Sequence, residues 1–217
     1  MKTLHTTLAA LSAAALIAAP AFAQTPEASA SASPAAASAG APGAEDMQKM
    51  MELAKPSENH KMLAELAGNW TYTVTMWMDP SAPPQTSKGT AVRKAIMDGR
   101  FYVGEFTGKM EMPGADGKKK EMTFTGKSLE GYDNAKQKFV STWVDNMGTG
   151  IMMSEGTYDP ATKTFNYTSE VEMMPGMKTK VRAATRIVDK DHHTFDWYEN
   201  RGGQEVKTME INYTRKK

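Results

Sequence analysis

Methionine is the residue type whose number most suggests chemistry in this chain. The 217 residues include 18 methionines and no cysteine, and several methionines are grouped, as in Met110-x-Met112, Met152-Met153 and 173–177. Thioethers are soft ligands that suit copper(I). Methionine also fills irregular cores and adaptable pockets, and Met152 and Met153 must point to opposite faces of a strand. We therefore favour packing, with a copper(I) site as the alternative.

Groups for acid–base chemistry give no catalytic pattern. The sequence has no Gly-x-Ser-x-Gly, phosphate loop, His-Glu-x-x-His or paired-cysteine motif. His60 lies one turn before an apolar pair, which predicts a half-buried structural histidine. The strand carboxylates considered are Glu105, Asp145, Glu155 and Asp196. Because side chains alternate along a strand, most of these carboxylates are expected to point outward or to lie at a rim of the barrel. We therefore assign none of them as an acid or base and expect no enzyme.

Overall charge excludes two classes of partner. Lys and Arg number 26 against 25 Asp and Glu, and removal of Lys2 with a leader would leave 25 against 25. A balanced surface produces no field that attracts nucleic acid or anionic lipid. The absence of cysteine also excludes disulfides and thiol nucleophiles.

The N-terminal 45 residues predict export and a flexible tether. Lys2 precedes an apolar run over 8–19 and the small-residue motif that ends at Ala23, which is typical of a signal peptide over 1–23. That run is too short to span a bilayer, so we expect no membrane insertion after cleavage. Residues 24–45 are almost wholly Ala, Ser, Pro, Gly and Thr and predict a disordered linker. We expect a periplasmic or secreted protein.

Residues 46–67 predict two short helices that cap the following domain. Asp46 is the expected cap of the first helix, and Pro56 ends it. Ser57 is the expected cap of the second helix, which Gly68 terminates.

From Trp70 onward the apolar residues alternate, as in a half-buried strand. Short turns such as Asp98-Gly99 separate the segments and favour antiparallel neighbours. About ten strands with no helix to cover a sheet predict an all-β, up-and-down meander that closes into a barrel over 68–217. The expected strands begin at Trp70 and continue at 87–97, 100–110, 120–132, 138–146, 150–158, 163–173, 178–188, 192–200 and 204–214.

Two of the turns share one pattern, Tyr-Asp-x-Ala-x-x-x-Phe. It runs from Tyr132 to Phe139 and again from Tyr158 to Phe165. We interpret it as one hairpin design used twice.

A set of ordered motifs resembles a known family. Gly68-Asn69-Trp70 at the start of the first strand and Arg215 at the end of the last are similar to the Gly-x-Trp and distant Arg of the calycins, the lipocalin-like barrels. That resemblance implies that the Arg stacks on the Trp and closes the barrel floor. The wider set resembles a bacterial family known only as the domain of unknown function fifteen-seventy-nine; it comprises His60-x-x-Leu63-x-x-Leu66-x-Gly68-x-Trp70, 76–78, 111–114, 141–145, 158–160 and 213–215.

The expected function is binding of a small, largely apolar molecule inside the barrel. Alternation and size select five wall residues, Tyr72, Met76, Trp143, Phe165 and Trp197. The alternative is a structural or protein-binding module whose own side chains fill the barrel.

A cofactor is a further alternative. Some ten-stranded calycin barrels hold haem through one late histidine, and His192-His193 is the late pair here. We instead expect this pair to be solvated beside the turn over 189–191.

Overall fold

The computed structural model describes residues 42–79, 81–114 and 118–217. The predicted signal peptide and all but the last four residues of the predicted linker lie outside the described residues. The described residues belong to one compact unit, Pro42–Lys217.

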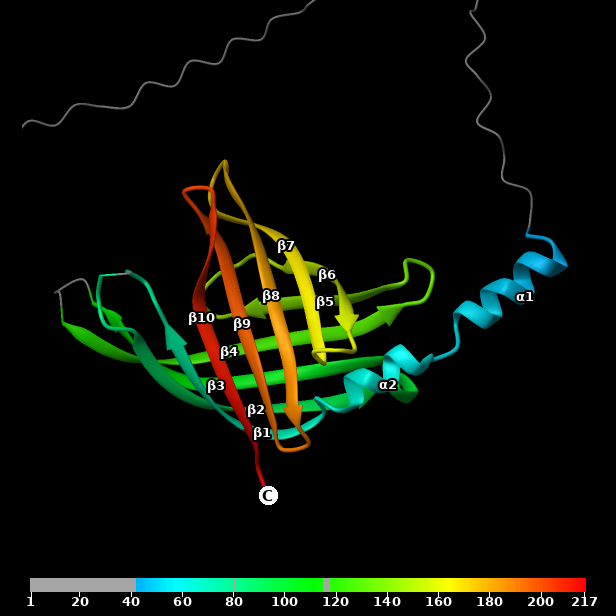
Figure 1. Cartoon of the computed structure of the whole chain (residues 1–217), viewed down its shortest axis with the longest axis horizontal. Helices are drawn as coiled ribbons and strands as arrows, with labels where there is room; N and C mark the ends of the chain where they lie inside the picture. Colours follow the sequence, from blue (N-terminus) through cyan, green and yellow to red (C-terminus); the bar gives the residue numbers. More distant parts are fainter. Residues whose placement is uncertain (1–41, 80, 115–117) are drawn as a thin grey trace, which may run out of the picture. The chain divides into compact units, whose positions relative to one another are not determined.

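Ten antiparallel strands close into one barrel, which confirms the predicted fold class. Each strand pairs with its neighbours in sequence, and β1 pairs with β10 to close the ring (Figure 1). Two helices precede the strands, and one 3-10 turn connects β2 to β3. The elements are α1 (Ala44–Leu53), α2 (Glu58–Ala64), β1 (Gly68–Met76), β2 (Gln85–Ile96), η1 (Met97–Gly99), β3 (Phe101–Pro113), β4 (Lys119–Asp133), β5 (Lys138–Asp145), β6 (Met152–Asp159), β7 (Thr164–Met174), β8 (Met177–Asp189), β9 (His192–Arg201) and β10 (Gln204–Arg215).

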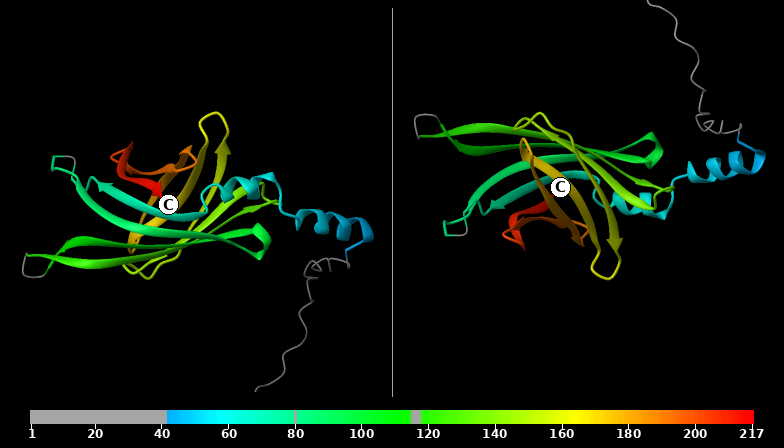
Figure 2. Two further views of the ribbon diagram at one scale, coloured as in Figure 1. Left: turned by 90° about the horizontal axis from the view of Figure 1, so that it is seen from below. Right: turned by 90° about the horizontal axis from the view of Figure 1, so that it is seen from above.

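The barrel has two different ends, which we call the floor and the mouth. The floor carries the start of β1, the end of β10 and the β2–β3, β4–β5, β6–β7 and β8–β9 connections. The mouth carries the other connections between consecutive strands. Helix α2 contacts β3, β4 and η1 beside the floor, as the two views of Figure 2 show. The floor is therefore the covered end.

The two helices have different caps and different packing. Ser57 is the N-cap of α2, as predicted, and its backbone N–H donates to His60 Nδ1 at 2.9 Å. The expectation for α1 is wrong, because Gly43 is its N-cap and Asp46 is the third helical residue, whose Oδ2 accepts the Gly43 N–H at 3.2 Å. Helix α2 buries His60 and Leu63, whereas α1 buries no residue. Only α2 covers the barrel floor with buried side chains.

The repeated hairpin is confirmed. Asp133 Oδ1 accepts the N–H of the residue two positions later at 2.9 Å, and Asp159 Oδ1 does the same at 2.9 Å. Gln137 and Lys163 occupy equivalent positions with φ of 54° and 53°. The two turns bring four rings together at the floor: Tyr132 meets Phe139 at 4.9 Å, Tyr158 meets Phe165 at 4.6 Å, and the two Phe rings lie 5.0 Å apart.

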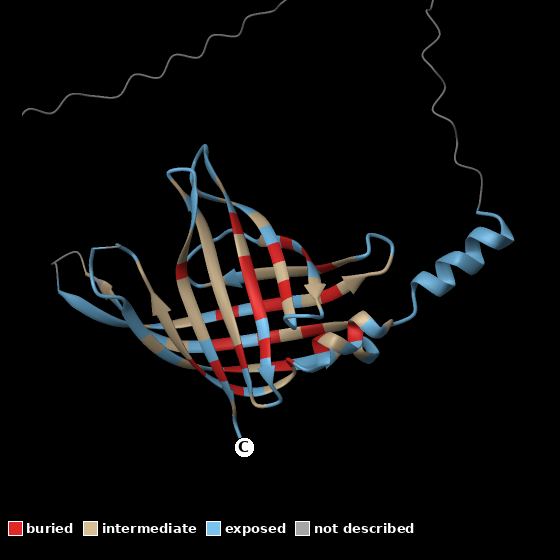
Figure 3. Ribbon diagram, viewed as in Figure 1, coloured by how far each residue is buried: buried red, intermediate tan, exposed pale blue. Residues whose placement is uncertain are grey.

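Buried residues form two apolar clusters. The first joins Leu63 and Leu66 at the floor to the hairpin aromatics and to β7 and β8. The second centres on Trp70 and spans β1, β2, β3 and β10. Figure 3 shows the buried residues on α2 and along the middle of the barrel strands, while α1 is exposed throughout. Burial of these aromatic faces is the main source of stability in a fold of this kind.

Methionine contributes to neither cluster as a buried residue. None of the 16 methionines whose burial is described is buried, and nine are exposed. The part of the interpretation that placed methionine in the buried core is therefore wrong, although partly exposed Met62 packs against the first cluster. The large core positions are occupied by Trp, Tyr, Phe and Leu instead.

Candidate binding site in the barrel interior

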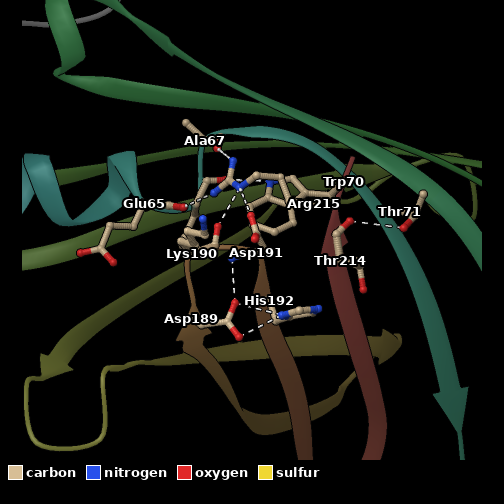
Figure 4. A network of polar contacts seen from close by, with 11 residues as sticks. Glu65, Ala67, Trp70, Thr71, Asp189, Lys190, Asp191, His192, Thr214 and Arg215 are labelled. Carbon is tan, nitrogen blue, oxygen red and sulfur yellow. Dashed lines mark hydrogen bonds and ion pairs between the residues drawn. The ribbon is translucent and has the colours of Figure 1, made fainter. Parts of the chain in front are cut away.

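The floor is closed by a cation over an aromatic ring. The Arg215 guanidinium lies 4.0 Å from the centroid of the Trp70 ring, which is 1% exposed. Arg215 also donates to three backbone carbonyls, of Ala67 at 2.7 Å, Glu65 at 3.0 Å and Lys190 at 2.8 Å (Figure 4). These contacts tie the last strand to the end of α2 and to the β8–β9 turn. The stacking that the calycin resemblance implies is present.

Gly68 allows this arrangement. Its φ is 129°, and a Cβ there would collide with Arg215 Nη1. A side chain at this position would strain the backbone and displace the guanidinium. The Gly-x-Trp motif therefore makes room for the arginine as well as supplying the ring.

A buried ion pair lies inside the barrel above the floor. Arg93 on β2 donates through Nη2 to Glu130 Oε2 on β4, and the two side chains are 8% and 12% exposed. Burial raises the pKa of Tyr167 and of Tyr213, and the charges of both Arg93 and Glu130 act on these two phenols. The pair neutralises itself, so the barrel interior carries no net charge at this level.

The two neighbouring histidines have opposite environments. His192 is half exposed and its Nδ1 lies 2.9 Å from Asp189 Oδ1 (Figure 4). His193 is 2% exposed, stacked on Tyr213 at 4.2 Å and set edge-on against Trp70 at 4.3 Å. The expectation of a solvated pair is therefore wrong for His193, because β9 turns that side chain inward opposite Tyr213.

His193 is a neutral imidazole with no polar partner. Both ring nitrogens are buried without a hydrogen bond among the described residues, and Ser128 Oγ is in the same condition. Burial lowers the pKa of His193 to about 2, and the Arg93 and Arg215 charges act in the same direction. Neither nitrogen is accessible, so a haem iron could not reach one unless the packed rings moved. This geometry does not fit haem binding through His193, and His192 points to the opposite face of β9, away from the barrel interior.

The mouth half of the interior is lined by large side chains that remain partly exposed. They face inward because each lies two or four residues, or a further multiple of two, from a buried residue on the same strand. Met76 lies directly opposite Met209, Met110 opposite Met122, and Trp143 opposite Met152. The half-buried inward-facing set is Val74, Met76, Met110, Met122, Phe124, Trp143, Met152, Phe195, Trp197, Met209 and Ile211.

A cavity of about 440 Å³ opens at one side of the mouth. Val74 and Met76 of β1, Ser87 of β2 and Met110 of β3 supply its inner wall, and the β1–β2 connection supplies Pro83 and other residues at its rim. This volume suits a small ligand. A separate groove of about 610 Å³ lies on the outer face of the barrel over β4 to β6, where its lining includes Leu129, Val140, Thr142 and Met153.

The five predicted wall residues are all on the inner face but at different depths. Met76, Trp143 and Trp197 are half-buried in the mouth half, and Met76 lines the cavity. Tyr72 is 6% exposed within the Trp70 cluster, and Phe165 is fully buried in the floor cluster. The structure therefore brings Met76, Trp143 and Trp197 to the partly accessible half of the interior, and places Tyr72 and Phe165 in packed core.

The strand carboxylates considered for catalysis all have structural partners. Glu105 pairs with Lys127 and Glu155 with Lys136 on the outer surface. Asp145 Oδ2 accepts the Trp143 Nε1–H at 2.7 Å, and Asp196 pairs with Lys207 at 3.3 Å. These contacts give each of them a role in holding strands or side chains.

Comparison with known families identifies the family of this chain but assigns it no activity. A family model described as "Protein of unknown function (DUF1579)" matches residues 55–215. The chain belongs to this family. The match begins just before α2 and ends at Arg215, so the DUF1579 region includes the floor helix and the whole barrel. No match was found among curated proteins.

A solved structure supports the fold of this DUF1579 chain. The crystal structure of Rv2717c from M. tuberculosis is similar with a TM-score of 0.53 at 14% identity, over 75% of this chain and 100% of that one. At this identity the likeness concerns the fold. Within the described part of the chain, no helix is long and apolar enough to cross a membrane.

The sequence interpretation of the DUF1579 chain missed the polar residues inside the barrel. Arg93 and Glu130 stand in the same alternation as buried Ala91 and Ser128, which was the available signal for inward-facing charges. The inward direction of His193 had a local signal, because it stands four residues before Trp197 on the same strand, but its full burial depends on closure of β9 against β10.

Proposed function

We propose that this protein binds a small, largely apolar molecule in the mouth half of the barrel, without catalysis, in the periplasm or outside the cell. The observation that carries the proposal is the half-buried state of large apolar side chains that face inward there. In a barrel filled by its own residues such side chains would be covered on all sides. Exposed apolar surface in a concave site favours an apolar ligand.

The polar residues below the mouth support a neutral ligand. Arg93 is already paired with Glu130, and His193 is uncharged near neutral pH because burial lowers its pKa to about 2. A charged ligand head would find no free opposite charge among these three residues. Val74, Met76 and Met110 supply dispersion contacts in the cavity wall. The lining also contains polar residues, and its two charged ones, Glu111 and Lys119, pair with each other at 3.0 Å.

The mouth methionines suit a ligand of variable shape. Met76 and Met110 have several rotatable bonds and polarisable sulfur atoms, so they adapt to flat or irregular apolar surfaces. Trp143 and Trp197 add rigid rings on the opposite strands of the same half. This combination favours a broad class of apolar molecules over one tightly fitted compound.

Titration with an apolar fluorescent probe tests the proposal. N-Phenyl-1-naphthylamine, a neutral apolar probe, is added to the exported protein, and both the probe emission and the intrinsic tryptophan emission are followed. Met76→Gln places an amide in the cavity wall and should raise the dissociation constant about tenfold, because the amide loses water on binding without gaining a partner.

Met78→Gln is the matched control. Met78 lies two residues beyond Met76, outside β1, and is 65% exposed. Its substitution should leave the dissociation constant unchanged, and both variants are checked for unaltered melting temperature. Equal effects of the two substitutions, or no saturable binding, would favour the alternative of a protein-interaction module. Native mass spectrometry of protein from its own periplasm would then identify any retained partner by added mass.

A further inference from the structure

Helix α1 carries three methionines on one exposed face. Met47, Met50 and Met51 stand at positions i, i+3 and i+4 of the ten-residue helix and are 44%, 58% and 60% exposed. Side chains at this spacing are direct neighbours, with Cβ atoms about 5–6 Å apart. Three thioethers are therefore presented together at the surface.

Packing within the described chain does not account for these residues. Helix α1 has no buried residue. It is held to the barrel through backbone carbonyls, since Asn134 Nδ2 donates to the carbonyls of Leu53 and Lys55 at 2.8 Å each. Methionine normally ranks among the buried residue types. Exposed methionine is not rare in this chain, but on α1 three exposed methionines share one helical face, and this grouping needs another reason.

The chemistry of the thioether supplies that reason. An apolar face that served only for docking could use leucine, which is a better-defined apolar side chain and an equally good helix former. What methionine adds is a soft, neutral sulfur ligand, and soft ligands select copper(I). The flexible side chains of an i, i+3, i+4 triad allow the three sulfur atoms to converge on one ion in a trigonal arrangement.

Charge on the helix favours a cation. Lys55 pairs with Glu52 directly after the helix at 2.6 Å, and Glu45 and Asp46 then stand against Lys49, so the segment keeps one net negative charge. Thioethers remain neutral when they bind, and the surplus carboxylates attract a monovalent cation toward the helix. These carboxylates are hard ligands and do not compete with sulfur for copper(I).

We infer that Met47, Met50 and Met51 form a copper(I) site on α1. The site is independent of the barrel interior and of the ligand proposed for it. It requires only that α1 is folded, because the three sulfur atoms come from one helix. Copper binds as Cu(I) and is released as Cu(I), with no change of oxidation state in the protein.

Competition for copper(I) tests the site. The full exported chain is mixed anaerobically with the Cu(I) complex of bicinchoninate, and loss of the coloured complex gives the stoichiometry and affinity. The wild type should take one Cu(I) through α1. In Met47→Leu/Met50→Leu/Met51→Leu the helix keeps its apolar face but loses its sulfur ligands. The affinity should fall by more than the roughly 10- to 100-fold that loss of an outer-shell partner costs.

A second triple variant controls for methionine content. Met78→Leu/Met97→Leu/Met147→Leu removes three exposed methionines from three different connections of the barrel. It should bind Cu(I) as the wild type does. Circular dichroism checks that both triple variants retain the wild-type fold.

Silver(I) gives a residue-specific measurement that does not depend on activity. With methionine methyl groups labelled with ¹³C, one equivalent of Ag(I), a redox-inert substitute for Cu(I), should shift the resonances of Met47, Met50 and Met51 together. The inference is overturned if other methyl resonances shift and these three do not. It is also overturned if the α1 triple variant binds Cu(I) as tightly as wild type, which would leave the face as a docking surface.

Discussion

The contact between Trp70 and Arg215 gives the sharpest test of how the barrel is closed. Trp70→Ala removes a ring that is 1% exposed and whose Nε1–H donates to the Leu66 carbonyl at 3.0 Å. The resulting cavity and the unpaired carbonyl should lower the free energy of unfolding by about 3–5 kcal/mol. Arg215→Ala removes the stacked cation and three hydrogen bonds to carbonyls. It should also be strongly destabilising.

The coupling between the two substitutions measures the contact itself. Because the guanidinium lies 4.0 Å from a buried ring, we expect a coupling energy of about 1–2 kcal/mol. Urea unfolding followed by far-ultraviolet circular dichroism at pH 7 avoids dependence on the lost tryptophan emission. Trp77 and Lys207 form a comparison pair at 5.8 Å with a partly exposed ammonium, which should couple by about 0.5 kcal/mol or less.

A result within about 0.4 kcal/mol of zero for the floor pair would refute the reasoning, because that is the scatter of independent sites. The double variant matters as much as the single ones. If Arg215 acts only through the carbonyls of Glu65 and Ala67 after α2 and of Lys190 in the β8–β9 turn, its loss lowers the free energy of unfolding equally with or without the ring. The ring–cation contact would then be incidental, and α2 alone would close the floor.

Three further measurements probe other parts of the chain. Gly89→Ala would drive a Cβ into the Thr107 carbonyl of the neighbouring strand and should lower the free energy of unfolding by about 2 kcal/mol, whereas Gly148→Ala meets no atom within 4 Å and should have little effect in the same urea assay. His193 should make the fold sensitive to acid. Its pKa of about 2 in the folded state lies below the ordinary value of 6.5, so the unfolded state binds the extra proton. The free energy of unfolding should therefore fall as the pH drops below 6.5, by up to about 1.4 kcal/mol per pH unit. His193→Phe should show a shallower pH dependence of the melting temperature, and an equal slope would contradict this assignment. Intact-mass measurement of the exported protein should give Gln24 as the N-terminus, and a chain that retains the first residues would contradict the predicted cleavage.

Alternation and turn chemistry were sufficient to predict the barrel. Each expected strand lies within a few residues of an observed one, because a half-buried antiparallel strand imposes period two on its sequence. The turns at Asp133 and Asp159 could also be predicted, because the hydrogen bond that each Asp accepts from a backbone N–H two residues later depends only on the local sequence. Ser57 was found as a helix cap for the same reason.

The position of a residue along the barrel axis could not be predicted from alternation. Alternation predicts that Tyr72 and Met76 share the inner face. It does not predict that Tyr72 lies in the packed core and Met76 in the cavity wall. That difference depends on which strands are opposite and how far they are staggered, and on the position of α2. The same limit explains His193, whose burial depends on a strand 20 residues further along the chain. Sequence patterns therefore identified residues on the inner face of the barrel but did not show which of them are packed in the core and which remain partly exposed.

The interior is filled at the floor and partly open at the mouth because the chain places most of its packed aromatic pairs at the floor. The two repeated hairpins both turn at the floor, and each carries its own Tyr–Phe pair into the same cluster that α2 completes with Leu63 and Leu66. The mouth connections have no equivalent pair, and the inward positions near them are taken largely by methionine. A packed floor contributes strongly to the stability of the fold, because Phe139 and Phe165 are almost completely buried there. Adaptable side chains at the mouth then remain free to meet a ligand, and substitutions there should change binding more than they change stability.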